Sequence, residues 1–168
     1  LPEDALISVS ELVKKLVESV RIPVVAAGGI MDAKVILGVL GQGASAVQMG
    51  TAFLSCPESG IHHYYKEELT CRTQDDTTLT RVYSGKLARG LKNEFINRMN
   101  KYEKMILDYP IQNSLTRSMR EEAGKQSNKE FLSMWAGQGH FLCKSLPAGE
   151  LIKNFVEEVD LLLSASGN

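Results

Sequence analysis

Ile22-Pro-Val-Val-Ala-Ala-Gly-Gly-Ile30 and Ala46-Val-Gln-Met-Gly-Thr-Ala-Phe53 are the two stretches that decide the fold of this chain. Each is an apolar run interrupted by glycine near its end, and residues 31–40 between them have a helical pattern. Residues 24–26 are all apolar, so we expect both faces of the first strand to be buried, as in a parallel sheet beneath helices. Two successive βα units of this kind are typical of a (β/α)8 barrel.

The glycine ends of the two runs predict a phosphate-binding site. Gly28 and Gly29 follow the first strand, while Gly50 and Thr51 follow the second. A missing Cβ lets backbone N–H groups approach an anion closely. A right-handed crossover through one short helix places the strands side by side, so both glycine ends meet at one carboxyl edge. The alternative is that these glycines only make tight turns, but their tandem arrangement favours a phosphate-bearing cofactor or substrate.

The length of the chain is too small for a whole barrel. A complete (β/α)8 barrel needs about 250 residues, whereas this chain has 168. One amphipathic helix, over residues 9–20, precedes the first strand, and Ser8 or Ser10 can cap it. The chain begins with Leu1 rather than methionine. We therefore expect the C-terminal piece of a larger α/β protein, which supplies the last two strands of a TIM barrel.

Beyond Phe53 the pattern becomes mostly helical. Periodicity and helix breakers predict helices over residues 59–69, 93–107, 114–126, 128–135 and 148–164. The alternating, β-branched residues 77–83 predict one strand. We expect the terminal helix to bury one face, made of Leu151, Ile152, Phe155, Val156, Val159 and Leu162.

Composition and charge exclude several classes of protein. The formal net charge is −1, which excludes the strong positive field of a non-specific nucleic-acid binder. The sequence holds no apolar run near the ~20 residues of a membrane span. The cysteines, Cys56, Cys71 and Cys143, are odd in number and lack metal-ligand spacing, so we expect free thiols, a cytoplasmic location and no metal site.

Several polar and aromatic residues allow a structural or a functional interpretation. Lys86, Arg89 and Lys92 either form a solvated basic turn or steer an anionic substrate. Trp135 is expected to anchor packing, and Asp75-Asp76 is expected to form a turn. The histidines, His62, His63 and His140, are expected to be solvated on helix surfaces rather than catalytic.

Five blocks, in order along the chain, resemble the nitronate monooxygenase family. They are Pro23-Val-Val-Ala-Ala-Gly-Gly-Ile30, Val47-Gln-Met-Gly-Thr-Ala-Phe-Leu54, Thr80-Arg-Val-Tyr-Ser-Gly-Lys-Leu-Ala-Arg-Gly-Leu91, Tyr109-Pro-Ile-Gln-Asn113 and Leu132-Ser-Met-Trp-Ala-Gly-Gln138. The two barrel blocks are similar to those of flavin-dependent enoyl-acyl-carrier-protein reductases and inosinate dehydrogenases. The last two blocks favour nitronate monooxygenase.

The resemblance implies an FMN-binding barrel with a mostly helical lid domain appended over its mouth. The expected parts are residues 1–60 (barrel), 61–147 (lid, with one short strand) and 148–168 (a helix packed back on the barrel). The family oxidises alkyl nitronates, such as propionate 3-nitronate, with O2. By motif, the FMN phosphate would be held by backbone N–H groups of Ala27, Gly28, Gly29, Gln48, Met49, Gly50 and Thr51.

The catalytic residue of the family has no counterpart in these blocks. The family's base is a histidine in a Gly-Gly-His loop, and none of the three histidines of this chain matches it. We therefore expect no catalytic residue in this chain and an inactive fragment when it is alone. Tyr109 and Arg117 are candidate contacts for the nitronate substrate, and a homo-oligomer is a further expectation.

Two alternatives stay open. One is the enoyl-acyl-carrier-protein reductase branch of the same fold, which would oxidise NAD(P)H with an enoyl thioester. The other, from a different class, is a non-catalytic phosphate-binding or interaction fragment.

Overall fold

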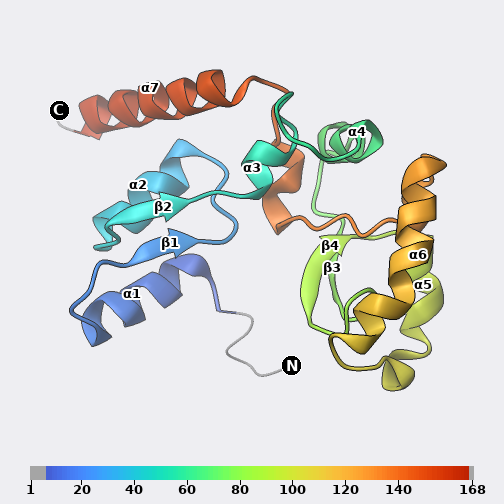
Figure 1. Ribbon diagram of the computed structural model, residues 1–168. Coiled ribbons are helices and arrows are strands. Elements are labelled where there is room, and N and C mark those ends of the chain that lie inside the picture. The colour runs from blue at the N-terminus through green and yellow to red at the C-terminus, as the bar shows by residue number, and fades with distance from the viewer. Residues whose placement is uncertain (1–6, 167–168) are drawn as a thin grey trace. The chain divides into compact units, whose positions relative to one another are not determined.

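The computed structural model describes residues 7–166, which fall into two units that are each compact by themselves. Unit 1 contains the described residues up to Ser59 and those from Leu142 onward, and unit 2 runs from Gly60 to Phe141. Both mix helices with short strands (Figure 1). The assignment of residues 1–60, 61–147 and 148–168 to barrel, lid and packing helix stays a prediction, and the ends of these ranges (1–6 and 167–168) lie outside the described residues.

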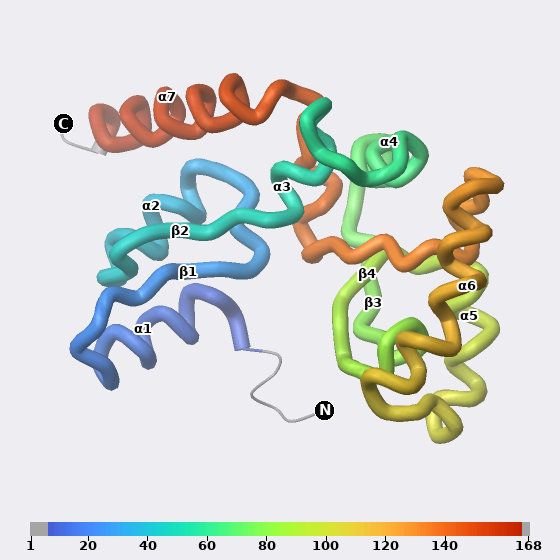
Figure 2. Tube along the Cα trace, in the orientation of Figure 1, coloured from blue at the N-terminus to red at the C-terminus, as the bar shows by residue number. Residues whose placement is uncertain are grey.

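Unit 1 is built on two parallel strands joined by a helix. Strand β1 (Val25–Ala27) leads through α2 (Ala33–Gly41) into β2 (Ala46–Gln48), and the two strands pair in parallel, with Ala26 opposite Val47. Figure 2 shows the two strands side by side, with the connecting helix between them in the chain. The predicted tandem βα arrangement is therefore confirmed.

The helices of unit 1 begin where the sequence provides caps. Helix α1 (Val9–Ser19) is capped by Ser8, whose side chain accepts a hydrogen bond from the Glu11 amide at 3.2 Å. Helix α2 is capped by Asp32 in the same way, through the Val35 amide at 2.9 Å. These side chains satisfy backbone N–H groups that have no partner inside the helix.

The core of unit 1 lies between its helices and the two strands. Helix α7 (Ala148–Ser166) packs against α2, and Leu151 and Phe155 enter a cluster with Ala26, Ile36 and Val39. The rest of this cluster is Val13, Ile30, Met31, Ala44, Ala52 and Cys56.

Two burial predictions for unit 1 are wrong. Val25 is 53% exposed, although we expected both faces of β1 to be buried. Its neighbour Ala26 points to the opposite face and is buried, so only one face of β1 is covered in unit 1. Ile152 and Val156 of α7 are also exposed, whereas Leu151 and Phe155 are buried, so only part of the predicted apolar face is covered.

The second apolar run is shorter as a strand than the sequence suggests. Strand β2 ends at Gln48, and the four-residue helix α3 (Thr51–Leu54) follows at once. Gly50 is the N-cap residue of α3. It has no side chain, so α3 lacks a side-chain cap.

Unit 2 contains a hairpin surrounded by helices. Its elements are α4 (His63–Cys71), β3 (Thr77–Thr80), β4 (Ala88–Leu91), α5 (Glu94–Asn100), the 3-10 helix η2 (Glu103–Met105), α6 (Ile111–Lys125), the 3-10 helix η3 (Lys129–Phe131), and η4 (Gln138–Leu142), which crosses its boundary. Strands β3 and β4 pair antiparallel, with Leu79 opposite Arg89.

Several predicted elements of unit 2 need correction. Residues 81–83 are not part of β3, and residues 88–91, which we expected in a basic turn, form its partner strand. The helix predicted over 93–107 ends at Asn100. Residues 128–135 form only the short helix η3, because tertiary hydrogen bonds replace helical ones there.

The core of unit 2 is organised by buried polar side chains. Tyr83 is almost fully buried, and its hydroxyl donates to the carbonyl of Leu132 at 2.6 Å. The Asn93 amide also donates to that carbonyl, at 2.8 Å. The Trp135 ring meets the Tyr83 ring edge to face at 5.7 Å, as expected for a packing anchor.

Among residues 7–166, the helices are all too short or too polar to cross a membrane.

Asn93 generates a prediction about the stability of unit 2. Its Oδ1 accepts from the Ile96 amide at 3.2 Å, and its Nδ2 donates to Leu132. Asn93→Ala removes a helix cap and leaves buried groups unpaired, so we expect a loss of about 2–3 kcal/mol in the free energy of unfolding. Fluorescence of Trp135, the single tryptophan, during urea unfolding measures the loss. The control Asn97→Ala, on the exposed side of α5, should cost little; equal losses would contradict the assignment.

Candidate functional site

The carboxyl ends of β1 and β2 lie at the same edge of the sheet. Ala27 pairs with Gln48, so the turns that follow the two strands start at the same level. Gly28 and Gly29 have φ angles of 110° and 69°, a left-handed region that suits glycine. The two turns predicted to hold a phosphate are therefore brought together by the parallel pairing.

The backbone of these turns has the donor set that a phosphate needs. Gly28 and Gly29 form the turn after β1, and Gly50 precedes α3, whose first N–H groups have no partner within the helix. A Cβ added at any of the three would meet nothing within 4 Å, so the space in front of each is open. Oriented amides beside open space fit a dianion such as the FMN phosphate without an arginine. Of the other predicted contacts, Ala27 and Gln48 are exposed, and Met49 and Thr51 are half-buried.

Three contacts that the sequence did not predict hold the second turn. Cys143 lies against the carbonyl of Thr51, Ser55 donates to the backbone of Lys144, and Glu58 accepts from a backbone amide at the start of α7. These partners are about ninety positions apart, so neither periodicity nor motif spacing could join them.

The substrate candidates of unit 2 occupy two different places. Arg117 is exposed and lines a pocket with His62, Asn113, Arg120 and Glu121. Tyr109 is 51% exposed, and the Lys86 ammonium lies 4.7 Å from the centre of its ring.

One guanidinium of the Arg117 pocket is fixed in place. Arg120 donates to both the carbonyl and the side-chain oxygen of Asn113, at 3.0 and 2.9 Å, and to the hydroxyl of Thr116 at 3.2 Å. Arg117 has no such partner among the described residues. The pocket therefore contains the Arg120 guanidinium, fixed by hydrogen bonds, and the Arg117 guanidinium, which has no partner among the described residues. Two neighbouring guanidinium groups suit a carboxylate or another small anion.

The basic residues near the hairpin are engaged rather than free in a solvated turn. Arg89 lies on β4 and donates to the hydroxyl of Thr77 at 3.0 Å. Lys92 lies 3.6 Å from the carboxylate of Asp76. Lys86 alone of the three sits in the turn, above Tyr109.

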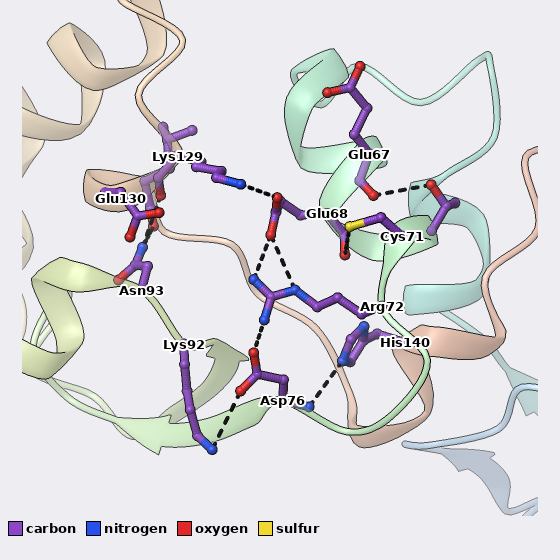
Figure 3. Close-up of polar contacts among 12 residues, drawn as sticks. Glu67, Glu68, Cys71, Arg72, Asp76, Lys92, Asn93, Lys129, Glu130 and His140 are labelled. Atoms are coloured by element: carbon purple, nitrogen blue, oxygen red, sulfur yellow. Dashed lines mark hydrogen bonds and ion pairs between the residues drawn. The ribbon is translucent and has the colours of Figure 1, made fainter.

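A chain of ion pairs crosses unit 2 (Figure 3). Glu68 is 8% exposed, and its carboxylate lies 2.5 Å from both the Lys129 ammonium and the Arg72 guanidinium. Arg72 also pairs with Asp76, which reaches Lys92. Burial alone would raise the pKa of Glu68, but the hydrogen bonds and charges of Lys129 and Arg72 outweigh it and lower that pKa. Each charged group of this network contacts at least one group of opposite sign, as expected of a structural network.

His140 corrects one prediction directly. It is 0% exposed, whereas we expected a solvated helix-surface histidine. Its Nε2 accepts from the Asp76 amide at 3.4 Å. Burial, and then the charge of Arg72, lower the pKa of this imidazole, so it is neutral near pH 7. His62 and His63 are exposed, in keeping with the prediction.

The acidic pair Asp75-Asp76 belongs to the turn before β3. Asp75 Oδ1 accepts from the amide and the hydroxyl of Thr77, at 2.9 and 2.6 Å. Across residues 7–166, histidine, cysteine and carboxylate side chains do not gather in groups of three that could hold a metal ion.

Comparison with known proteins places the chain in a family. A sequence model of that family, described as nitronate monooxygenase, matches residues 2–158. The chain belongs to the nitronate monooxygenase family. The resemblance that the five sequence blocks carry is therefore confirmed.

Curated relatives have the same name. A probable nitronate monooxygenase of Staphylococcus saprophyticus is 43% identical over 159 residues, which cover 95% of this chain and 45% of the relative. One from Staphylococcus haemolyticus is 44% identical over 161 residues, covering 96% and 45%. The chain thus spans less than half the length of these relatives.

Two solved structures are similar to the chain. A nitroalkane oxidase from Streptomyces ansochromogenes has a TM-score of 0.90 at 39% identity, over 97% of this chain and 46% of that one. FabK from Thermotoga maritima has a TM-score of 0.78 at 30% identity, over 95% and 51%. The α/β fold class is supported by both.

The lowered pKa of Glu68 predicts a pH-dependent contribution to stability. A carboxyl whose folded pKa is depressed stabilises the fold above its unfolded pKa, and this contribution is lost as the pH falls through the folded pKa. Glu68→Gln should therefore cost about 2 kcal/mol of unfolding free energy at pH 7, and the difference from wild type should shrink below pH ~4.3, the usual Glu value. Trp135 fluorescence in urea at several pH values measures it.

The matched control for this prediction is Glu67→Gln, on the exposed side of the same helix. It should change stability little at any pH. A cost for Glu68→Gln that stays constant as the pH falls would show that the carboxylate charge is not its source.

Proposed function

We propose that this chain is the phosphate-binding and lid portion of an FMN-dependent nitronate monooxygenase, with the strands of unit 1 as the last two strands of a TIM barrel. The reaction is the oxidation of alkyl nitronates, such as propionate 3-nitronate, with O2. Membership of the family supports the reaction class. The observation that carries the cofactor assignment is the pair of glycine turns at one edge of the parallel strands, with open space before them.

The residues of this chain bind and orient rather than react. The amides of Gly28, Gly29 and Gly50 would hold the FMN phosphate, with Thr51 beside them. When bound, the flavin supplies the redox chemistry of the reaction. We assign no catalytic role to the three histidines, because His140 is buried and bonded and the other two match no catalytic motif of the family.

For the substrate, we retain Arg117 and Tyr109 as contacts. Arg117 is supported by its pocket, where Arg120 is already held by Asn113. A nitronate is an anion, so two neighbouring guanidinium groups match its charge. Tyr109 keeps an exposed ring with a cation above it, which adds positive potential beside that aromatic surface.

FabK supports a second candidate function, reduction of an enoyl thioester with NAD(P)H. Its structure resembles the chain, although with lower identity than the nitroalkane oxidase. The family model and the curated relatives favour nitronate oxidation.

The cofactor assignment predicts a phosphate-specific effect at Gly50. Gly50 has φ −106°, which any residue can adopt, and a side chain there would occupy the open space before the turn. Gly50→Val should weaken FMN binding by the intact protein about tenfold or more, the usual cost of losing charge-assisted hydrogen bonds. Affinity for riboflavin, which lacks the phosphate, should stay unchanged. Quenching of flavin fluorescence measures both.

The matched control is Gly38→Val, because that position in α2 also has nothing within 4 Å of its Cβ. This variant should bind FMN as wild type does. If Gly50→Val and Gly38→Val bind FMN equally well, the cradle is misassigned.

The activity itself separates the two candidate functions. The intact protein should consume O2 with propionate 3-nitronate in the absence of NAD(P)H, measured with an oxygen electrode. Arg117→Gln should raise KM for this anionic substrate about tenfold, as expected for a lost charge-assisted hydrogen bond, and leave the affinity for FMN unchanged. NAD(P)H oxidation that depends on an enoyl thioester, without nitronate-dependent O2 uptake, would favour the reductase instead.

A further inference from the structure

Hydrogen bonds join the turn that follows β2 to a segment of unit 1 that is distant in sequence. The Ser55 hydroxyl donates to the carbonyl of Lys144 at 2.9 Å, and the Cys143 thiol donates to the carbonyl of Thr51 at 3.2 Å. The Ala148 amide donates to the Glu58 carboxylate at 3.0 and 3.2 Å. Hydrogen bonds between three pairs of residues thus join residues 51–58 to residues 143–148.

Two of these donors are shielded from water. Ser55 is only 1% exposed, and Cys143 is half-buried. Burial is the main reason that the pKa of the Cys143 thiol rises to about 11. Cys143 therefore stays protonated near pH 7 and remains a hydrogen-bond donor to Thr51.

The turn needs such support because its own helix is too short to be stable. Helix α3 has four residues and no side-chain cap at Gly50. Helix nucleation is unfavourable, and an isolated helix of this length does not persist in water. The direction of the Gly50 and Thr51 amides therefore depends on contacts with the rest of unit 1.

We propose that Ser55 and Cys143 are positioning residues for the cofactor phosphate, which act by holding the backbone of the Gly50-Thr51 turn in the orientation that binds it. The proposal rests on the function proposed above. Neither side chain would contact the phosphate itself. Each sets the geometry of amides that do.

The structure makes a specific prediction for the binding of two flavins. Ser55→Ala and Cys143→Ala should each weaken FMN binding by the intact protein about fivefold, the effect of one buried hydrogen bond. Riboflavin affinity should not change, because riboflavin has no phosphate to misplace. Cys143→Ser keeps a hydroxyl donor, so it should recover part of the FMN affinity. Cys71→Ala, at an exposed thiol, is the control and should bind both flavins as wild type does.

The readout separates a positioning role from a merely structural one. Thermal unfolding of each variant, followed by circular dichroism, sets a temperature at which all are folded, and binding is measured there. Equal losses for FMN and riboflavin would overturn the proposal, since the residues would then only support the fold. Unchanged FMN binding in both alanine variants would also overturn it. A wild-type protein without preference for FMN over riboflavin would overturn the phosphate site itself, and the proposal with it.

Discussion

The parallel pairing of β1 with β2 is the constraint on which the candidate site depends. Each strand ends in a glycine turn, and two such turns together offer more backbone N–H donors to a dianion than either turn alone. Pairing Ala27 with Gln48 brings both turns to one edge. The helix between the strands makes this possible, because a parallel connection needs a crossover of that kind.

The second turn owes its shape to residues far along the chain. Helix α3 is too short to be stable by itself. Hydrogen bonds with the segment from Cys143 to Ala148, made by buried or half-buried donors, hold it in place. Helix α7 then continues from that segment and packs on α2, the helix that joins the two strands. The same part of unit 1 thus supports the core and the proposed phosphate turn.

In unit 2, by contrast, polar side chains are buried together and bond to one another. Tyr83 and Asn93 share the Leu132 carbonyl, and Glu68 is matched by two cations. Buried polar groups are costly unless every partner is present. Such networks fix one arrangement of the helices around the hairpin, and they leave Arg117 as a cation without a partner among the described residues, which makes it available to an anion.

The sequence by itself determined the two βα units, the cap of α1 as Ser8 or Ser10, the glycine turns and the family. These features are local, because a strand period, a cap or a turn is encoded within a few residues. Tertiary structure decided the partner strand β4, the early end of α5, the burial of His140 and the hydrogen bond from Cys143 to Thr51. Each depends on groups far apart in the chain, whose contacts outweigh local propensity and leave no periodic trace in the sequence.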